Sequence, residues 1–134
     1  MKTKFLWILR LAAAAILLQT LFFKFTGAPE SQFIFSTLGV EPFGRYFAGV
    51  SELVASILLV IPGLEILGAS MAIGIMLGAI ASHIFILGIV VQDDGGLLFA
   101  LACLVLVASS VIVFLRKEQI PFWIDQMKRL ILKA

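Results

Sequence analysis

The chain has 134 residues, of which 62% are hydrophobic and 13% charged, with a formal net charge of +2 and a mean hydropathy of +1.16. Soluble domains carry about 25% charged residues, and a folded chain of this size leaves about a third of its unfolded surface exposed. The composition therefore excludes a soluble globular domain, a disordered tail and a nucleic-acid partner, and it predicts an all-α integral membrane protein.

Four apolar stretches are long enough to cross a bilayer as helices, which requires about 20 residues each. We expect them at about residues 5–23, 43–61, 66–91 and 97–115. Pro42 suits the first turn of the second span, and Pro62-Gly63 ends that span. Asp93 and Asp94 can cap the start of the fourth span. The sequence thus predicts a four-helix bundle within a single membrane domain, residues 1–134.

The first loop is long and contains apolar residues. Pro29 opens and Gly39 closes a stretch of helical length, which predicts a short interfacial helix at about residues 29–38.

The C-terminal segment, about residues 119–133, alternates apolar and basic residues at helical spacing. It is too short and too charged to be a fifth span, so we expect an amphipathic tail on an anionic membrane surface.

Lysine and arginine residues are distributed unevenly between the two ends of the predicted bundle. The end with both termini carries Lys2, Lys4, Arg116, Lys117, Lys128, Arg129 and Lys133. The other end carries only Lys24 and Arg45. Because cytoplasmic loops are enriched in cations, we predict that both termini are cytoplasmic.

Four ionisable residues are expected at similar depth near the outer leaflet: Lys24, Arg45, Glu52 and His83. Glu52 follows Arg45 by seven residues, about 10 Å deeper, and Arg45, Gly49, Glu52 and Ser56 share one helix face. Ionisable groups in spans are costly and usually face the bundle interior. Glu52 must therefore pair with Lys24 or Arg45, or be protonated.

Two interpretations of this cluster stay open. It can form an apolar pocket with convergent polar groups, suited to a quinone head group or another small apolar ligand. It can equally be a buried ion pair that only fixes the helix register. Arg10 is expected apart from it, near the inner leaflet.

The chain offers no recognisable set of ligands for an intrinsic cofactor. Cys103 is the only cysteine, so an internal disulfide or dithiol relay is impossible, and no HxxxH motif or His/Cys pair is present. We therefore expect no metal site and no intrinsic haem or flavin.

Gly74, Gly78 and Ser82 form a stripe of small residues on the third span. Such a stripe allows another helix to approach closely. We expect it to serve packing within the chain, and contact with a second copy of the chain is the alternative.

The run KFTGAPESQFIFSTLGVEPFGRYFAGVSELVASILLVIP (residues 24–62) resembles the DoxX-like membrane family, as do the later segments GASMAIGIMLGAIASHIF, VVQDDGGLLFALA and RKEQIP. The resemblance implies a small four-span bundle of the bacterial inner membrane, related to a thiosulfate:quinone oxidoreductase subunit and to membrane partners of redox enzymes. The matching motif positions are Lys24, Gly27, Pro29, Glu30, Glu41-Pro42, Gly44-Arg45, Glu52 and His83. At the position of Phe43, a tryptophan would match the family pattern equally well.

Three functions follow as hypotheses. The first is a non-haem, non-flavin subunit or accessory of a quinone-linked redox system, which receives its electrons from a partner protein. The second is a non-catalytic scaffold that holds a partner protein, and the third is a small proton-coupled transporter that uses Glu52. Whether the chain is an enzyme stays undecided, because family does not fix function.

Overall fold

The computed structural model describes residues 2–134, and all regular secondary structure in this range is helical. The four long helices are α1 (Lys2–Thr26), α3 (Phe43–Val60), α4 (Glu65–Ser82) and α5 (Leu97–Leu115). One π-helical turn, η1 (His83–Leu87), continues α4. The remaining helical segments are α2 (Pro29–Thr37), the 3-10 turn η2 (Lys117–Gln119) and α6 (Ile120–Lys133). The predicted helical class is confirmed.

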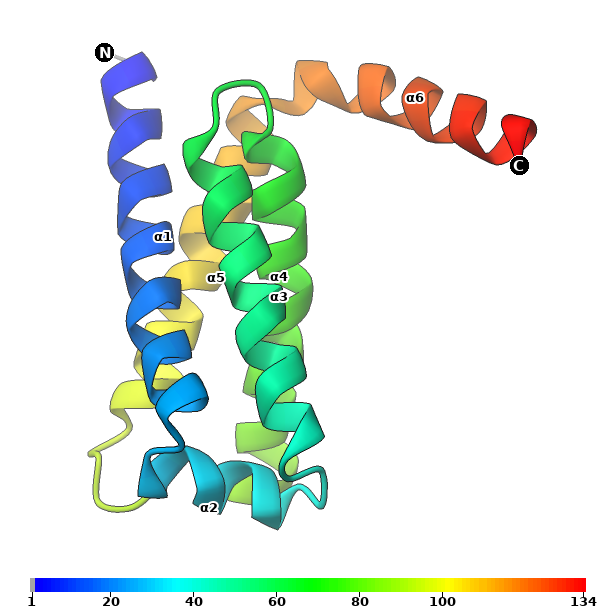
Figure 1. Ribbon diagram of the computed structural model, residues 1–134. Helices are drawn as coiled ribbons and strands as arrows, with labels where there is room; N and C mark the ends of the chain where they lie inside the picture. Colours follow the sequence, from blue (N-terminus) through cyan, green and yellow to red (C-terminus); the bar gives the residue numbers. More distant parts are fainter. Residues whose placement is uncertain (1) are drawn as a thin grey trace.

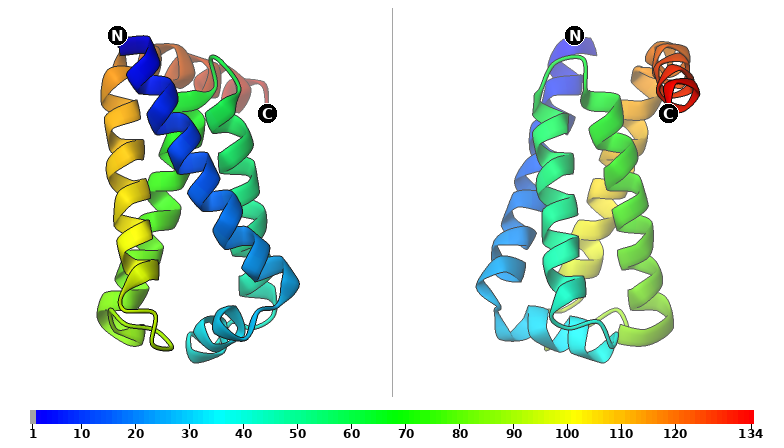
Figure 2. Two further views of the ribbon diagram at one scale, coloured as in Figure 1. Left: turned by 90° about the vertical axis from the view of Figure 1, so that its left-hand side faces the viewer. Right: turned by 45° about the vertical axis from the view of Figure 1, so that its right-hand side comes forward.

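The long helices form a four-membered ring in which α1 packs against α3 and α5, and α4 packs against the same two helices. Helix α2 crosses one end of this bundle, here called the α2 end (Figure 1). The start of α1 and helix α6 lie at the opposite end, here called the terminal end (Figures 1 and 2). Helices α1, α3, α4 with η1, and α5 are each long and apolar enough to cross a membrane.

Small and aliphatic side chains fill the centre of the bundle, and large aromatic ones cover its flanks. Ala13, Ala55 and Val105 are completely buried, whereas the aromatic side chains of Phe47 and Phe85 are 76% and 81% exposed. Water would penalise such an exposed aromatic surface. The distribution is what a bundle surrounded by hydrocarbon requires.

The predicted boundaries of the helices are close to the observed ones, with one clear error. The fourth span has the predicted limits, the second ends one residue earlier, at Val60, and the first extends at both ends. The third span does not reach residue 91. Its last helical residue is Leu87, because Gly88 adopts φ 84° and redirects the chain.

Of the two predicted capping residues, Asp94 caps α5 and Asp93 is exposed. Its Oδ1 accepts hydrogen bonds from the backbone N–H groups of Val91 (3.0 Å) and Gly96 (2.8 Å), and its Oδ2 accepts one from Leu98 (3.2 Å). The carboxylate thus satisfies donors that the helix start leaves free.

The predicted packing role of the small-residue stripe on α4 is wrong for its glycines. A Cβ atom added to Gly74 or Gly78 would meet nothing within 4 Å, so no other helix packs closely against these two glycines. Gly78 and Ser82 instead line an internal cavity. The close approach is made one and a half turns earlier, at Gly68. A Cβ atom there would lie 2.6 Å from the backbone nitrogen of Leu59 and 2.9 Å from the carbonyl oxygen of Ala55 on α3.

Candidate functional site

A cavity of about 350 Å³ lies inside the α2 end of the bundle, lined by residues from α1, α2, α3, α4, η1 and α5. Most of its lining is apolar. The polar or ionisable side chains on its wall are Thr20, Lys24, Glu30, Ser31, Glu52, Ser82 and His83. Helix α2 closes the end of the bundle below it, which explains why residues of the first loop belong to its wall (Figure 1).

The central polar contact of the cavity is the ion pair between Lys24 on α1 and Glu52 on α3. Lys24 Nζ lies 3.0 Å from Glu52 Oε1, and the two side chains are only 16% and 4% exposed. The hydroxyl of Thr20, one turn before Lys24, lies 3.3 Å from Glu52 Oε2. Of the two cations expected to pair with Glu52, Lys24 and Arg45, the structure therefore shows Lys24 as the partner.

His83 reaches the same cavity from the π-helical turn η1. Its Nδ1 lies 2.9 Å from the carbonyl oxygen of Gly88. A carbonyl can only accept a hydrogen bond, so Nδ1 carries the proton, and a neutral ring keeps a lone pair on Nε2. The imidazole also packs edge-on against Phe99, with ring centroids 5.6 Å apart. The π-turn thus fixes both the position and the tautomer of this residue.

Arg45 does not join this cluster, which corrects the prediction of four converging groups. Its Nε lies 2.7 Å from Oε1 of Glu41, one turn earlier, and its Nη1 donates to the carbonyl oxygen of Lys24. Its guanidinium also lies over the ring of Tyr46, 4.6 Å from the centroid. These local partners engage the guanidinium of Arg45, so it does not pair with Glu52. It holds the start of α3 against the end of α1, outside the cavity wall.

A second buried carboxylate, Glu65, lies at the terminal end and was not predicted. Arg10 Nη2 lies 3.8 Å from Glu65 Oε2, and Arg116 Nε lies 3.2 Å from Glu65 Oε1. The backbone N–H of Gly63 donates to Oε2 at 2.7 Å. We call Arg10, Glu65 and Arg116 the terminal ion cluster, and it joins α1, the start of α4 and the residue that follows α5.

Arg10 is itself tightly held within this cluster. Its Nε donates to the carbonyl oxygen of Leu59 at 2.6 Å, and its guanidinium lies 3.7 Å from the centre of the Trp7 ring. The same reasoning by depth that placed Lys24 near Glu52 could have found this cluster. An arginine near the inner end needs an acidic partner there, and two acidic residues lie near that end, Glu65 at the start of α4 and Glu118 in η2.

No protein-family model, curated protein or solved structure matches this chain.

The chemistry available at the α2 end is that of proton exchange and hydrogen bonding in an apolar setting. Glu52 and His83 are groups that can take up or release protons, and Lys24 is a cation that can polarise a bound oxygen. Among residues 2–134, no three His, Cys, Asp or Glu side chains lie close enough together to hold a metal ion.

Proposed function

We propose that the chain is a multi-pass protein of the bacterial inner membrane, in which α1, α3, α4 with η1, and α5 cross the bilayer. The apolar flanks of the bundle support this setting. The positive charges concentrate at the terminal end, which favours cytoplasmic termini and an α2 end at the outer leaflet. In this orientation α2 lies along the outer membrane surface.

We further propose that the cavity binds the head group of a quinone, and that the chain is a DoxX-like subunit or accessory of a quinone-linked redox system. The observation that carries this proposal is the largely apolar cavity of about 350 Å³ whose wall holds the Lys24–Glu52 pair and His83. Ligand sites combine an apolar lining with a few polar groups in this way.

In this proposal each polar side chain has a distinct role. Reduction of a quinone to a quinol takes up two electrons and two protons. A partner redox protein supplies the electrons, and Lys24 polarises a quinone oxygen. The Glu52 carboxylate and Nε2 of His83 each take up one proton from the aqueous side and then pass it to a quinone oxygen. The chain itself contributes no cofactor to the electron path.

Quinone titration of the purified protein in lipid nanodiscs tests the proposal. Glu52→Gln and His83→Ala should each weaken binding about tenfold, which corresponds to ~1.4 kcal/mol. Asp125→Asn, an exposed change on α6, is the matched control and should bind like the wild type. Equal binding by all four proteins, or by none, would reject the quinone site.

A non-catalytic scaffold is the second candidate, favoured by the exposed apolar side chains of α6. Deletion of the chain after Gln119 should then abolish capture of a partner protein while quinone binding persists.

A proton-coupled transporter is the third candidate, and the buried Glu52 favours it because its ion partner, Lys24, can be displaced by a cationic substrate. Substrate-dependent proton flux in vesicles, lost in Glu52→Gln, would support it.

A further inference from the structure

We propose that the ligand is a long-tailed amphiphile, an isoprenoid quinone, whose neutral head occupies the cavity and whose tail lies in a groove between α1 and α5. This inference rests on the proposed quinone site and extends it to the shape of the whole ligand. It also assigns the route of entry, which is sideways from the bilayer.

The groove has a volume of about 340 Å³ and an entirely apolar wall. Its residues include Phe5, Leu9 and Ala12 on α1, and Leu104, Ala108 and Val111 on α5. On α1 it extends from Phe5 to Ile16, which is about 16 Å at the helical rise per residue. Alanines on both helices leave the space that a narrow chain needs.

The groove continues the cavity along the same seam between two helices. Ile16 belongs to the walls of both, and on α5 the cavity residue Leu101 lies three positions before the groove residue Leu104, on the same helix face. The α1–α5 contact is the least extensive of the four contacts that close the ring. Figure 2 (left) shows the two helices diverging towards the α2 end. A head group in the cavity can therefore send its tail into the groove without leaving the protein surface.

The charges of the cavity wall argue for a neutral head rather than that of a phospholipid. The wall carries two carboxylates, Glu30 and Glu52, and one ammonium group, Lys24, which already pairs with Glu52. An anionic phosphate would meet uncompensated negative charge in an apolar setting, which is unfavourable. A quinone carries no charge and offers only oxygen acceptors.

The groove acts as a passage more than as a source of affinity. Bilayer hydrocarbon is as apolar as the groove, so moving the tail from lipid to protein gains little free energy. Blocking the groove must therefore penalise only those ligands that have a tail to place there. The difference between ligands with and without a tail therefore distinguishes a groove that holds the tail from one that is merely filled by lipid.

The experiment compares a tail-less benzoquinone with a long-chain isoprenoid quinone in nanodiscs. In Ala108→Phe, which fills the groove, we expect at least about tenfold weaker binding of the long-chain quinone and unchanged binding of the tail-less one. Ala100→Phe, at an exposed α5 position outside both walls, is the control and should bind both ligands like the wild type.

A second measurement on the wild-type protein does not depend on the folding of a variant. A quinone with a photoreactive group at its tail end should label α1 and α5 between residues 5–13 and 104–111. Labelling spread over all four long helices, or equal binding of both quinones by Ala108→Phe, would overturn the groove and leave the head-group site intact. Failure of the wild type to bind either quinone would overturn both proposals.

Discussion

Two buried carboxylates, Glu52 and Glu65, hold cations from other helices at opposite ends of the bundle, and their surroundings differ. Glu52 faces a cavity and a partly exposed lysine, whereas Glu65 is closed in by two arginines and a backbone N–H group. A carboxylate beside open space can meet a ligand, and one without it can only hold its neighbours. The residue-level geometry therefore supports the proposed binding role of Glu52 and favours a stabilising role for Glu65.

Replacing Glu65 by glutamine should destabilise the protein by about 3 kcal/mol, because removing one member of a buried ionic group leaves its partners unpaired. Glu118→Gln is the matched control. Glu118 lies 3.8 Å from the same Arg116 but is 58% exposed, so its loss should change the free energy of unfolding by less than about 0.5 kcal/mol. Unfolding in mixed micelles measures both. Equal effects would contradict the structural role of the terminal ion cluster.

The contacts of Asp94 lead us to predict that the stability of the protein decreases at acid pH. Burial acts to raise the pKa of Asp94, but the N–H donors of Val91, Gly96 and Leu98 outweigh it and hold the pKa below its ordinary value. A lowered folded-state pKa gives stability that is complete above the unfolded value of about 3.9 and is lost as pH falls through the folded value.

Hydrogen exchange of the Leu98 amide as a function of pH measures this effect. Protection should decrease as the pH falls below about 4 in the wild type. Asp94→Asn should remove most of that pH dependence. Asp93→Asn, at the exposed neighbouring position, should keep it. A wild-type amide whose protection does not respond to acid would refute the assignment.

At the scale of elements, helices α3 and α4 approach each other closely at Gly68. Gly74, on the same helix, has no such neighbour and allows a direct comparison. Gly68→Ala should destabilise the bundle by about 2 kcal/mol, since its methyl group would overlap the α3 backbone. Gly74→Ala should stabilise it by up to about 1 kcal/mol, because that site is open and alanine favours a helix. Thermal unfolding in detergent compares the two. A destabilised Gly74→Ala would indicate that a second chain covers this face.

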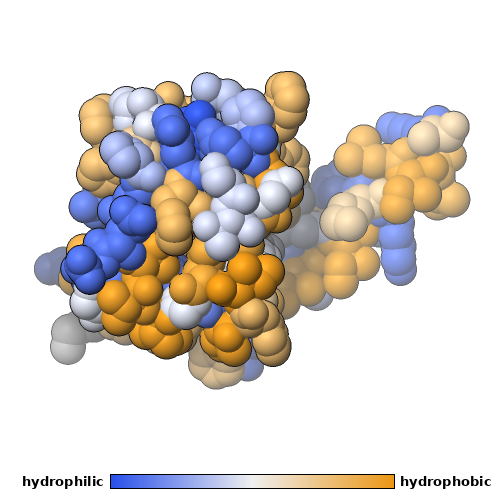
Figure 3. All heavy atoms as spheres, turned by 90° about the horizontal axis from the view of Figure 1, so that it is seen from below, coloured by the Kyte–Doolittle hydropathy of each residue, from blue (hydrophilic) through white to orange (hydrophobic). Residues whose placement is uncertain are grey.

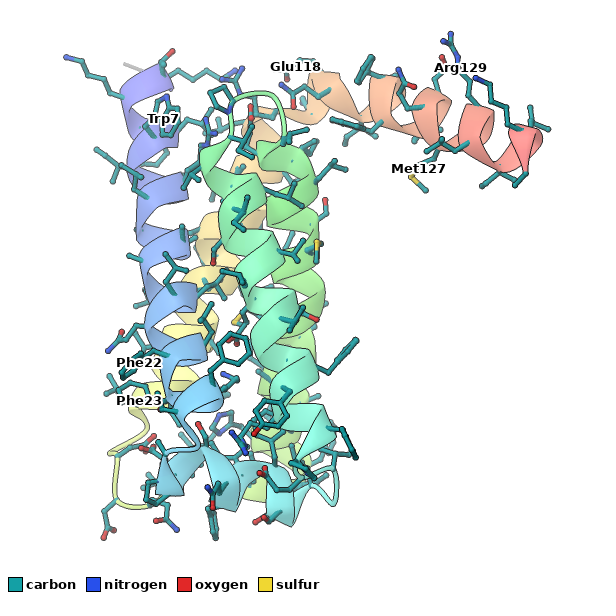
Figure 4. The ribbon with its side chains drawn as sticks, viewed as in Figure 1. Trp7, Phe22, Phe23, Glu118, Met127 and Arg129 are labelled. Atoms are coloured by element: carbon teal, nitrogen blue, oxygen red, sulfur yellow. The ribbon has the colours of Figure 1, made fainter. Side chains whose placement is uncertain are left out.

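Helix α6 extends from the terminal end across the direction of the long helices. Met127 points towards the side of the α2 end and Arg129 away from it (Figure 4). Seen from the α2 end, the near side of α6 is mainly hydrophobic (Figure 3). In the proposed orientation this places the apolar side on the bilayer and leaves basic side chains at the phosphate level.

This placement predicts a preference for anionic lipid. In a Trp7→Phe background, Trp123 fluorescence should be quenched by brominated lipid more strongly in phosphatidylglycerol than in phosphatidylcholine. Replacing Lys128, Arg129 and Lys133 by glutamine should remove the difference, at about 1 kcal/mol per basic residue. Quenching that is equal in both lipids for the wild type would place α6 in water or on a protein partner.

For the whole molecule, the proposed orientation can be tested by labelling single cysteines in a Cys103→Ser background. In intact spheroplasts, a membrane-impermeant maleimide should label Ser36→Cys on α2. It should label Ala134→Cys only after the membrane is opened, because the termini are proposed to be cytoplasmic. The reverse pattern would invert the bundle and would place the cavity at the inner leaflet.

The sequence predicts the parts of this molecule that depend on one helix at a time. The limits of α5 follow from an uninterrupted apolar run, and the Lys24–Glu52 contact is one of the two pairings that the depths of the residues along their helices allow. Arg45 was misplaced because a local partner, Glu41, competes for it within the same turn. Depth alone contains no information about such local competition.

Other features depend on how each helix is rotated about its own axis. Gly68 and Gly74 are both glycines within α4, and the sequence does not distinguish them. Only the packing of α3 against α4 decides which of them contacts another helix. Glu65 follows a Pro-Gly turn and reads as a loop residue, although the turn directs it into the core. The π-helical turn that begins at His83 cannot be recognised from the pattern of hydrophobic residues.

The two ionic contacts of α1 have a consequence for biosynthesis. In the proposed membrane setting, α1 enters the bilayer with Arg10 and Lys24 before either acidic partner has been synthesised. Lys24 is neutralised only when α3 has followed, and Arg10 only after α4 brings Glu65. Until α4 has been made, α1 therefore depends on the insertion machinery or on lipid head groups for its counter-charges.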